Sequence, residues 1–369
     1  MKILITGGAG FIGSHTADLL VEKGHSVRIL DSLEPQVHPA PPAYLHPRVE
    51  LVQGSVTDPG LWARSLEGCD AVIHLAALTG LAQSMYEPER YLRTNTLGTA
   101  LLYQALLKTP RHPIKKIIVA SSKTIYGEGS YSCRAHGTVY PGLRPPGQLR
   151  TKEWEVRCPA CNEPVTPVGI TEDKPPQTLS LYALTKYDTE RMALMYGNAL
   201  GIPTVALRYF SAFGPRQSLA NPYSGVCSIF LARLANGKPP VIFEDGGQLR
   251  DFTYVEDIAR ANLLALERPV EGAFNIGSGS GTSIREIAST LLDILDSTIA
   301  PELPGEFRVG DTRSDFADIS RARKELGFSP RWTVRKGLEC LVEWSREQEA
   351  ADSFGKAEAE RKLAFGRPS

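Results

Sequence analysis

The sequence lacks three features that would place the protein in a membrane or outside the cell. No uninterrupted apolar run reaches the roughly 20 residues that a membrane-spanning helix needs. The apolar start, Met1 to Ile5, runs directly into glycines without the charged region and cleavage site of a signal peptide, so it predicts a strand. Six cysteines in 369 residues are too few for a disulfide scaffold. We therefore expect a protein of the reducing cytoplasm with no membrane partner.

Net charge is also absent. Lysine plus arginine and aspartate plus glutamate each number 41, so the formal net charge is zero. A neutral chain has no long-range field that attracts nucleic acid, and we expect no nucleic-acid partner. Any phosphate would have to be recognised by individually placed residues. The length is more than one hydrophobic core usually supports, which predicts two lobes.

A glycine-rich turn follows the first predicted strand. Lys2 to Thr6 predicts the strand, Gly7-Gly-Ala-Gly10-Phe-Ile-Gly13 the turn, and Ser14 to Lys23 a helix. Gly7 permits a tight turn, Gly10 lets backbone N–H groups approach a pyrophosphate, and Gly13 lets the helix pack close to the strand. Three glycines alone would predict only a turn, but between a strand and a helix they predict a dinucleotide site.

An acidic residue follows the second predicted strand, Ser26 to Leu30. Asp31 stands about 20 residues past the glycines, where a carboxylate hydrogen-bonds a ribose 2′-hydroxyl and repels a 2′-phosphate. This position predicts NAD as the cofactor rather than NADP. Asp58, just after the third predicted strand at Val49 to Gln53, is placed to reach the adenine.

The alternation of strands and helices continues through the first half of the chain. Buried strands are predicted at Ala71 to Ala77, Ile117 to Ala120 and Ile202 to Leu207, with a long helix at Met85 to Lys108. This order is typical of an α/β fold with a Rossmann-type, doubly wound parallel sheet. We expect an NAD-binding domain, a smaller mixed α/β substrate lobe and a charged tail, at residues 1–208, 209–345 and 346–369.

Tyr182 and Lys186 lie four residues apart in a predicted helix that runs to Leu200, so their side chains share one face. An ammonium group near a phenol stabilises the phenolate and makes the tyrosine a better base at neutral pH. The pair alone is explained as well by an ordinary surface helix. The nucleotide-binding motif upstream favours a catalytic pair.

The alternation breaks at residues 128–176, which form a long insertion without persistent periodicity. Cys133-x-x-His136 and Cys158-Pro-Ala-Cys161 are two closely spaced pairs of the kind that hold tetrahedral zinc. Four protein ligands leave no open position, so such a zinc would be structural. A flexible loop with free thiols, or a different ligand in place of His136, remain alternatives. We expect the insertion to fold over the substrate end of the site that contains Tyr182 and Lys186.

Taken together, these motifs resemble the extended short-chain dehydrogenase/reductase superfamily, specifically its nucleotide-sugar epimerase and dehydratase branch. The resemblance covers Met1 to about Trp344 apart from the insertion. It is carried by the glycine turn, His74-Leu-Ala-Ala77, Ser84 with Pro88, Tyr91 and Asn95, Ser121-Ser122 before Tyr126-Gly127, Tyr182-x-x-x-Lys186, Arg250-Asp-Phe252 with Asp257, and Asn275-Ile-Gly277.

The resemblance implies a role for each group of residues. Ser122, Tyr182 and Lys186 would be catalytic. NAD would be bound by Gly7, Gly10, Phe11, Ile12, Gly13, Asp31, Ser32, Asp58, Leu75, Ala76, Ala77, Asn95, Tyr182 and Lys186. A nucleotide-diphosphate sugar would be bound by Ser84, Lys123, Thr124, Ser211, Arg216, Arg250, Asn275 and Arg313. A homodimer formed through the helices at Met85 to Lys108 and Tyr182 to Leu200 is also implied.

Two departures from the family pattern narrow the implied activity. The family's 4,6-dehydratases carry Asp-Glu where this chain has Lys123 and Thr124, so the elimination of water lacks its carboxylates. Ser211 stands where many members place asparagine, which leaves one substrate contact open. The stretch Gln83-Ser-Met-Tyr86, the turn at 221–225 and the insertion are similar to dTDP-L-rhamnose 4-epimerases. The resemblance therefore implies a 4-epimerase of a dTDP-6-deoxyhexose.

Other functions are also compatible with the cofactor fold. A keto-sugar reductase or dehydrogenase, or an epimerase of another nucleotide sugar, would use the same motifs. A non-enzymatic redox or zinc sensor would need the cofactor fold only for binding, and the presence of Ser122, Tyr182 and Lys186 disfavours it.

Overall fold

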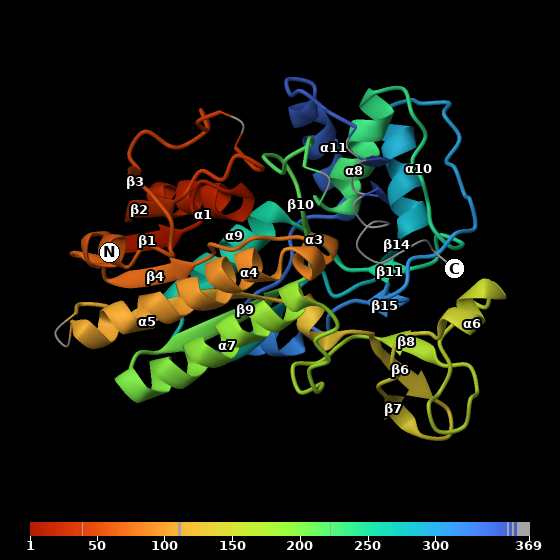
Figure 1. Cartoon of the computed structure of the whole chain (residues 1–369), viewed down its shortest axis with the longest axis horizontal. Helices are drawn as coiled ribbons and strands as arrows, with labels where there is room; N and C mark the ends of the chain where they lie inside the picture. Colours follow the sequence, from red (N-terminus) through yellow and green to blue (C-terminus); the bar gives the residue numbers. More distant parts are fainter. Residues whose placement is uncertain (39, 110–111, 222, 353, 356–357, 360–369) are drawn as a thin grey trace.

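A parallel sheet of seven strands forms the centre of the protein, in the order β13-β9-β5-β4-β1-β2-β3 (Figure 1). The structure is a computed structural model, and it describes the chain except residues 39, 110–111, 222, 353, 356–357 and 360–369. The strands are β1 (Lys2–Thr6), β2 (Ser26–Asp31), β3 (Glu50–Gln53), β4 (Ala71–His74), β5 (Lys116–Ser122), β9 (Thr204–Tyr209) and β13 (Gly272–Ile276). The Rossmann-type α/β prediction is confirmed.

Helices cover both faces of the sheet, and each face has its own apolar core. On one face α1 (Phe11–Glu22) packs against α9 (Val255–Glu267), and on the other lie α2 (Pro59–Leu66), α5 (Gly98–Lys108) and α7 (Leu181–Leu200). Because successive strand residues point to opposite faces, Ile3 and Ile5 join the first core and Leu4 joins the second. No helix of the described residues has the length and apolarity to span a membrane.

The division expected at residue 208 does not follow the sheet. β13 pairs with β9, with Phe274 opposite Leu207, and α9 packs on α1. Both elements come from the expected substrate lobe but belong to the central layers, because the chain returns to the sheet after a long excursion. The remainder of the lobe contains β10 (Ser211–Phe213), α8 (Val226–Ala235), β11 (Leu249–Arg250), β12 (Phe252–Tyr254), β14 (Thr282–Ser283), α10 (Ile284–Ile294), β15 (Ser314–Asp315), η3 (Ala322–Leu326) and α11 (Val334–Ser345).

The helix expected from Met85 to Lys108 is interrupted. Its parts are α3 (Leu81–Tyr86), α4 (Pro88–Tyr91), the π-helical η1 (Leu92–Leu97) and α5. The break falls at Glu87, whose backbone is non-helical at φ −118° and ψ 52°. A residue before proline is sterically disfavoured in the helical region, and Pro88 follows directly. The predicted strands differ from the observed strands only in where they begin and end.

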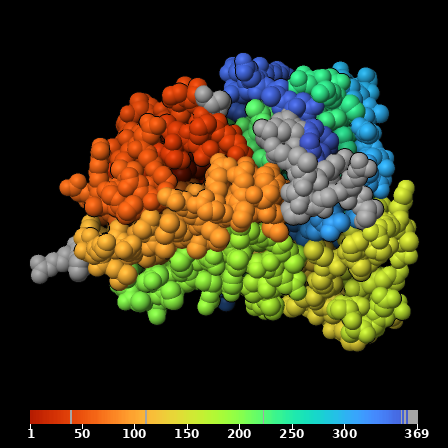
Figure 2. Space-filling view, in the orientation of Figure 1, coloured from red at the N-terminus to blue at the C-terminus, as the bar shows by residue number. Residues whose placement is uncertain are grey.

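The insertion is a small unit of its own. Its strands β6 (Ser130–Cys133), β7 (Gly137–Val139) and β8 (Thr166–Val168) pair antiparallel in the order β7-β6-β8, with α6 (Pro146–Arg150) between β7 and β8. The short helix η2 (Lys123–Tyr126) leads into it from β5. Figure 2 shows this unit, in yellow and yellow-green, at the edge of the molecule below the blue C-terminal region. Residues 360–369 of the predicted tail lie outside the described residues.

Candidate functional site

A cavity of about 850 Å³ lies between the central sheet and the substrate lobe. Its walls come from the turn after β1, the carboxyl ends of β2, β4 and β5, the start of α7, and β11. Ligands of open α/β sheets bind outside the carboxyl ends of the strands. The cavity is therefore the candidate site.

The glycine turn at one end of the cavity has the shape that a pyrophosphate needs. A Cβ on Gly13 would lie 2.2 Å from the carbonyl oxygen of Gly7, and Gly7 itself has φ +67°. Helix α1 begins at Phe11 without a side chain capping its N-terminus, and Gly10, Phe11, Ile12 and Gly13 all line the cavity. Helix N-terminal N–H groups attract anions, so these residues fit the diphosphate of a dinucleotide.

Asp31 ends β2 and lines the same part of the cavity. One carboxylate oxygen accepts from the backbone N–H of Ala9 at 2.9 Å and the other from that of Leu33 at 2.9 Å. Each oxygen keeps acceptor capacity for a ribose hydroxyl. Nearby wall positions are filled by Ser32, Leu75, Ala76 and Ala77.

Two residues expected to touch the cofactor do not line the cavity. Asp58 is exposed and caps α2, where its carboxylate accepts from the backbone N–H of Gly60 at 2.8 Å. Ser55 and Val56 line the cavity in its place. Asn95 is buried beneath the wall and makes hydrogen bonds of 2.8 and 3.1 Å to the backbone of Leu78, so it positions that loop from behind.

Ser122, Tyr182 and Lys186 meet in the cavity although Tyr182, in the first turn of α7, follows Ser122 by 60 positions in the sequence. Ser122 ends β5 and caps η2. The N-terminus of α7 is fixed by Ser180, which accepts from the N–H of Ala183 at 3.1 Å. Lys186 ties the helix to the sheet, since its Nζ donates to the carbonyl oxygen of Ala120 at 3.0 Å. These contacts bring helix and strand together across the insertion.

The acid–base balance of this group differs from the expectation. Burial raises the pKa of Tyr182 to about 12, and a hydrogen bond with Ser122 only partly offsets it. Burial lowers the pKa of Lys186 to about 8. Desolvation disfavours the charged forms of both Tyr182 and Lys186. In the protein without cofactor, this effect on the pKa of Tyr182 is larger than any stabilisation of its phenolate.

The opposite end of the cavity contains two basic side chains, each paired with aspartate. Arg250 on β11 lines it, with Nη2 2.7 Å from an Asp311 carboxylate oxygen and Nε 3.3 Å from Asp315. Lys123 also lines it and pairs with Asp315 at 2.5 Å. Ser211 and Arg216 also line the cavity, and Arg216 pairs with Asp18 of α1 at 2.7 Å.

Asn275 and Arg313, also predicted to bind the substrate, do not line the cavity. Asn275 is fully buried, accepts from the Tyr126 hydroxyl at 2.7 Å and donates to the carbonyl oxygen of Ile170 at 2.7 Å. Arg313 points away from the cavity and pairs with Asp245 at 2.7 Å. Their polar groups are already satisfied inside the protein.

Ser84 and Thr124 hold Tyr182 and Ser122 in place from behind. The hydroxyl oxygen of Ser84 accepts from the backbone N–H of Tyr182 at 3.0 Å, which holds the start of α7. The Thr124 hydroxyl donates to the Ser122 hydroxyl oxygen at 3.0 Å. Neither residue lines the cavity.

The cavity also contains residues that sequence reasoning missed. Arg308 lines the substrate end, with its guanidinium 4.0 Å from the centre of the Phe243 ring. Phe354, from the predicted charged tail, lines the same region and stacks on Arg233. In the sequence, only the nearby Gly310 indicates that Arg308 lies in a loop. The φ of +90° at Gly310 confirms a turn there.

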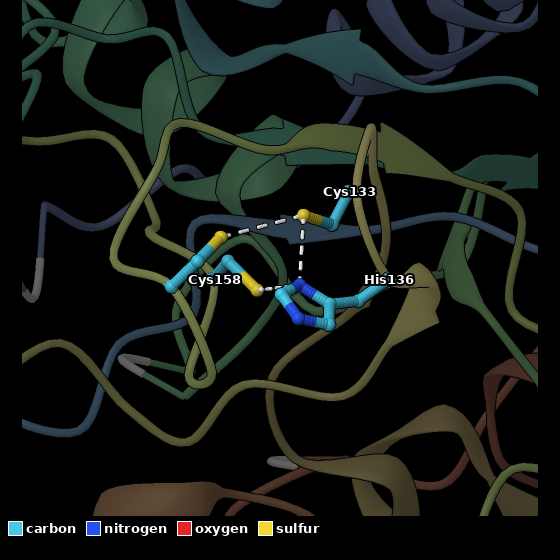
Figure 3. A group of neighbouring side chains, drawn as sticks. Cys133, His136 and Cys158 are labelled. Carbon is cyan, nitrogen blue, oxygen red and sulfur yellow. Dashed lines mark hydrogen bonds between the residues drawn. The ribbon is translucent and has the colours of Figure 1, made fainter.

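The four predicted metal ligands come together at the tip of the insertion. The Sγ of Cys133 lies 3.5 Å from Nδ1 of His136 and 3.7 Å from the Sγ of Cys161, and the Sγ of Cys158 lies 3.6 Å from the same Nδ1. Figure 3 shows Cys133, His136 and Cys158 converging. All four ligand atoms lie within 4.8 Å of one another.

This cluster is remote from the cavity. None of residues 128–176, all of which the structure describes, lines the cavity wall. The expectation that the insertion covers the sugar end is therefore wrong. It packs instead against the substrate lobe, where Ile170 bridges Ala317.

Comparisons with known proteins agree with this architecture. A family profile described as "NAD dependent epimerase/dehydratase family" matches residues 3–145 and 159–277. The chain is 36% identical to a dTDP-L-rhamnose 4-epimerase of Burkholderia thailandensis over 357 residues, which cover 94% of this chain and 95% of the relative.

Two solved structures extend the likeness to the fold. The UDP-glucose 4-epimerase of Thermotoga maritima with UDP-glucose has a TM-score of 0.78 and 31% identity, covering 94% of this chain and 99% of that one. The Thermus thermophilus UDP-glucose 4-epimerase in complex with NAD has a TM-score of 0.75 and 28% identity, covering 95% and 100%. With the profile matching more than half of its residues, the chain belongs to the NAD dependent epimerase/dehydratase family and is an enzyme of its nucleotide-sugar epimerase branch.

Proposed function

We propose that the chain is an NAD-dependent 4-epimerase of a dTDP-6-deoxyhexose that interconverts dTDP-L-rhamnose and dTDP-6-deoxy-L-talose. The observation that carries the reaction type is the meeting of Ser122, Tyr182 and Lys186 in one cavity, between the glycine turn and Arg250. The choice of sugar is supported by the likeness to the Burkholderia enzyme along nearly its whole length.

Tyr182 is the proposed base. Its phenolate takes the proton of the sugar C4 hydroxyl, directly or through Ser122, and gives a proton back when the alcohol forms again. Because burial alone keeps the Tyr182 pKa at about 12, the phenolate needs positive charge beside it, and Lys186 on the same helix face supplies part of that charge. When bound, NAD would take the hydride from C4 and return it to the other face of a transient 4-keto sugar.

The substrate end favours epimerisation over dehydration. Lys123 occupies the cavity wall and forms an ion pair with Asp315, so this position offers the sugar an ammonium group instead of a carboxylate. Removal of water across C5 and C6 needs an acid and a base there. A nucleotide-sugar reductase or dehydrogenase is the second candidate, since it would use the same tyrosine and lysine.

One experiment separates the two candidates. Purified protein is incubated with a panel of dTDP and UDP sugars without added cofactor, and products are resolved by anion-exchange chromatography and NMR. We expect C4-epimerised product from dTDP-L-rhamnose with no stoichiometric change in nicotinamide absorbance. Conversion that strictly requires added reduced cofactor would instead identify a reductase.

We also propose that the protein is a homodimer. Several large apolar side chains on neighbouring helices are exposed, namely Leu92, Leu97 and Leu107 on η1 and α5, and Leu184 and Met195 on α7. In Figure 1, α5 and α7 run side by side along one edge of the molecule. A second copy of the same surface would bury these side chains in a symmetric four-helix contact.

A further inference from the structure

We propose that Cys133, His136, Cys158 and Cys161 bind one structural zinc ion. This ion would stabilise the insertion, which in turn supports β11, the strand that carries Arg250. The cluster lies outside the cavity and takes no part in the proposed reaction. Its metal chemistry is therefore testable independently of the nucleotide sugar.

Three of the six distances between the ligand atoms match the edges of a zinc tetrahedron, and all six are within 4.8 Å. With Zn–S near 2.3 Å and Zn–N near 2.05 Å, tetrahedral angles place sulfur atoms about 3.8 Å apart and sulfur and nitrogen about 3.6 Å apart. The structure has 3.7 Å for Cys133 and Cys161, 3.5 Å for Cys133 and His136, and 3.6 Å for Cys158 and His136. Three sulfur atoms and Nδ1 thus already surround a point where one ion fits.

Each pair of ligands, Cys133 with His136 and Cys158 with Cys161, comes from one turn of the chain. Cys133 ends β6, His136 lies in the turn before β7, and backbone N–H groups of Ala135 and His136 donate to the Cys133 sulfur. In the second turn, the N–H groups of Ala160 and Cys161 donate to the Cys158 sulfur. Backbone N–H groups aimed at sulfur orient the ligands and compensate thiolate charge, as the surroundings of metal sites do.

A disulfide does not explain this arrangement. A sulfur–sulfur bond is about 2.05 Å long, far shorter than the 3.7 Å between Cys133 and Cys161, and it would leave His136 and Cys158 without a purpose in the cluster. All six cysteines of the chain are free. Sulfur-rich tetrahedral sets select zinc among common divalent ions.

The insertion is bonded to the substrate lobe at several points, two of which involve buried carboxylates. Glu128, fully buried at its start, accepts from the Tyr131 hydroxyl at 2.7 Å and from the backbone N–H groups of Arg313 at 2.9 Å and Ser314 at 3.2 Å. Further along, Arg144 forms a buried ion pair of 2.7 Å with Glu244.

These contacts connect the metal cluster to the cavity wall. β15, which Glu128 holds, pairs with β11, and β11 carries Arg250 into the cavity. β6 contains both Tyr131 and Cys133, so an ion at Cys133 restrains the strand that orders Glu128. A unit of about 50 residues has little apolar core of its own, which is why a metal would be needed to hold it.

Metal content is the first test. Wild-type protein produced in zinc-supplemented medium, purified without chelating resin, is measured by plasma mass spectrometry and is expected to carry about one zinc per chain. Cys158→Ser and His136→Ala should lose most of it, whereas the control Cys340→Ser, outside the cluster, should keep it. Folded wild-type protein without zinc, or with a disulfide between Cys133 and Cys161, overturns the proposal.

Cobalt substitution tests the metal site in the wild-type protein, so it does not depend on whether the variants fold. Wild-type protein loaded with Co²⁺ should show the intense visible bands of a tetrahedral, thiolate-bound ion. The pale spectrum of an octahedral oxygen-ligated ion would contradict the site.

The proposed effect of the ion on β11 and β15 is tested by hydrogen exchange on zinc-loaded and chelator-stripped wild-type protein. We expect faster exchange after stripping both in residues 130–168 and in the backbone of 249–250 and 313–315. Acceleration confined to the insertion would show that the ion does not support the strand carrying Arg250.

Discussion

Tyr182 is the residue on which the proposed chemistry depends most directly. Removing its hydroxyl by Tyr182→Phe should lower kcat about 10²- to 10⁴-fold, the usual contribution of a positioned acid–base group. NAD binding, measured by fluorescence or calorimetry, should persist because the glycine turn and Asp31 are untouched. The control Tyr187→Phe changes a tyrosine of the same helix that does not line the cavity. Full activity of Tyr182→Phe would refute the assignment.

Arg308 and Arg313 are a natural pair for testing which arginine faces the substrate. Arg308 lines the cavity, so Arg308→Ala should raise KM for the nucleotide sugar roughly 10- to 100-fold, the worth of a charged hydrogen bond. Arg313 is held by Asp245 and Glu155 away from the cavity, so Arg313→Ala should mainly lower the thermal midpoint. Equal KM effects in the two variants would contradict this division.

At the scale of elements, the site depends on how α7 docks on the sheet. Glu190 is buried on α7, accepts from the Ser121 hydroxyl at 2.6 Å and pairs with Arg208 of β9 at 2.6 Å. Glu190→Ala leaves Arg208 buried without its partner, which costs about 3–5 kcal/mol of unfolding free energy. Urea denaturation checks this, with Glu343→Ala on the exposed side of α11 as the control expected to change little.

The break at Glu87 and the π-helical turn at Leu92–Leu97 show why element boundaries were harder to predict than elements. Apolar spacing indicated one helix through this region. Pro88 alone marked the interruption, and its effect on the preceding backbone is local. The strands, in contrast, were placed well because β1, β4 and β5 are almost continuously apolar, as strands covered on both faces are.

For the whole molecule, stability should depend on buried neutral histidines. Burial lowers the pKa of His74 to about 3 and that of His15 to about 4, below the ordinary 6.5. The unfolded chain therefore binds more protons below pH 6.5, so stability is fully present above that pH and falls as pH drops toward 3. Each group contributes at most about 1.4 kcal/mol per pH unit.

Urea midpoints between pH 7.5 and 4.5 measure this dependence. His74→Gln should flatten the acid side of the profile, even if the variant is less stable throughout, because one titrating group is removed. A slope unchanged in that variant would show that other groups govern the acid sensitivity.

Assembly is the other whole-molecule prediction. Replacing two exposed apolar side chains of the proposed contact, Leu97→Glu with Met195→Glu, should convert a dimer to a monomer because charge cannot be buried between identical surfaces. Light scattering after size exclusion checks the mass. The exposed Val309→Glu, far along the chain from α5 and α7, is the control. A wild-type monomer would end the dimer proposal.

The sequence alone predicted the local motifs, because each depends only on residues that are close together in the chain. Gly7 to Gly13 predict a turn and helix start whatever surrounds them, and Tyr182 and Lys186 share a face in any helix. The Cys-x-x-His and Cys-x-x-Cys spacings likewise predict metal ligands. Lys123 and Thr124 disfavour dehydration by residue type alone.

Tertiary structure alone decided which of these residues share a wall. The sequence could not show that β13 returns to the sheet or that Arg308 lines the cavity while Arg313 pairs with Asp245. Nor could it show that Glu128 of the insertion is hydrogen-bonded to β15. Each depends on contacts between segments far apart in the chain, where direction is set by packing and not by the residue's own neighbours. Burial likewise reversed the expected change in the Tyr182 pKa, since loss of water is a property of the folded surroundings.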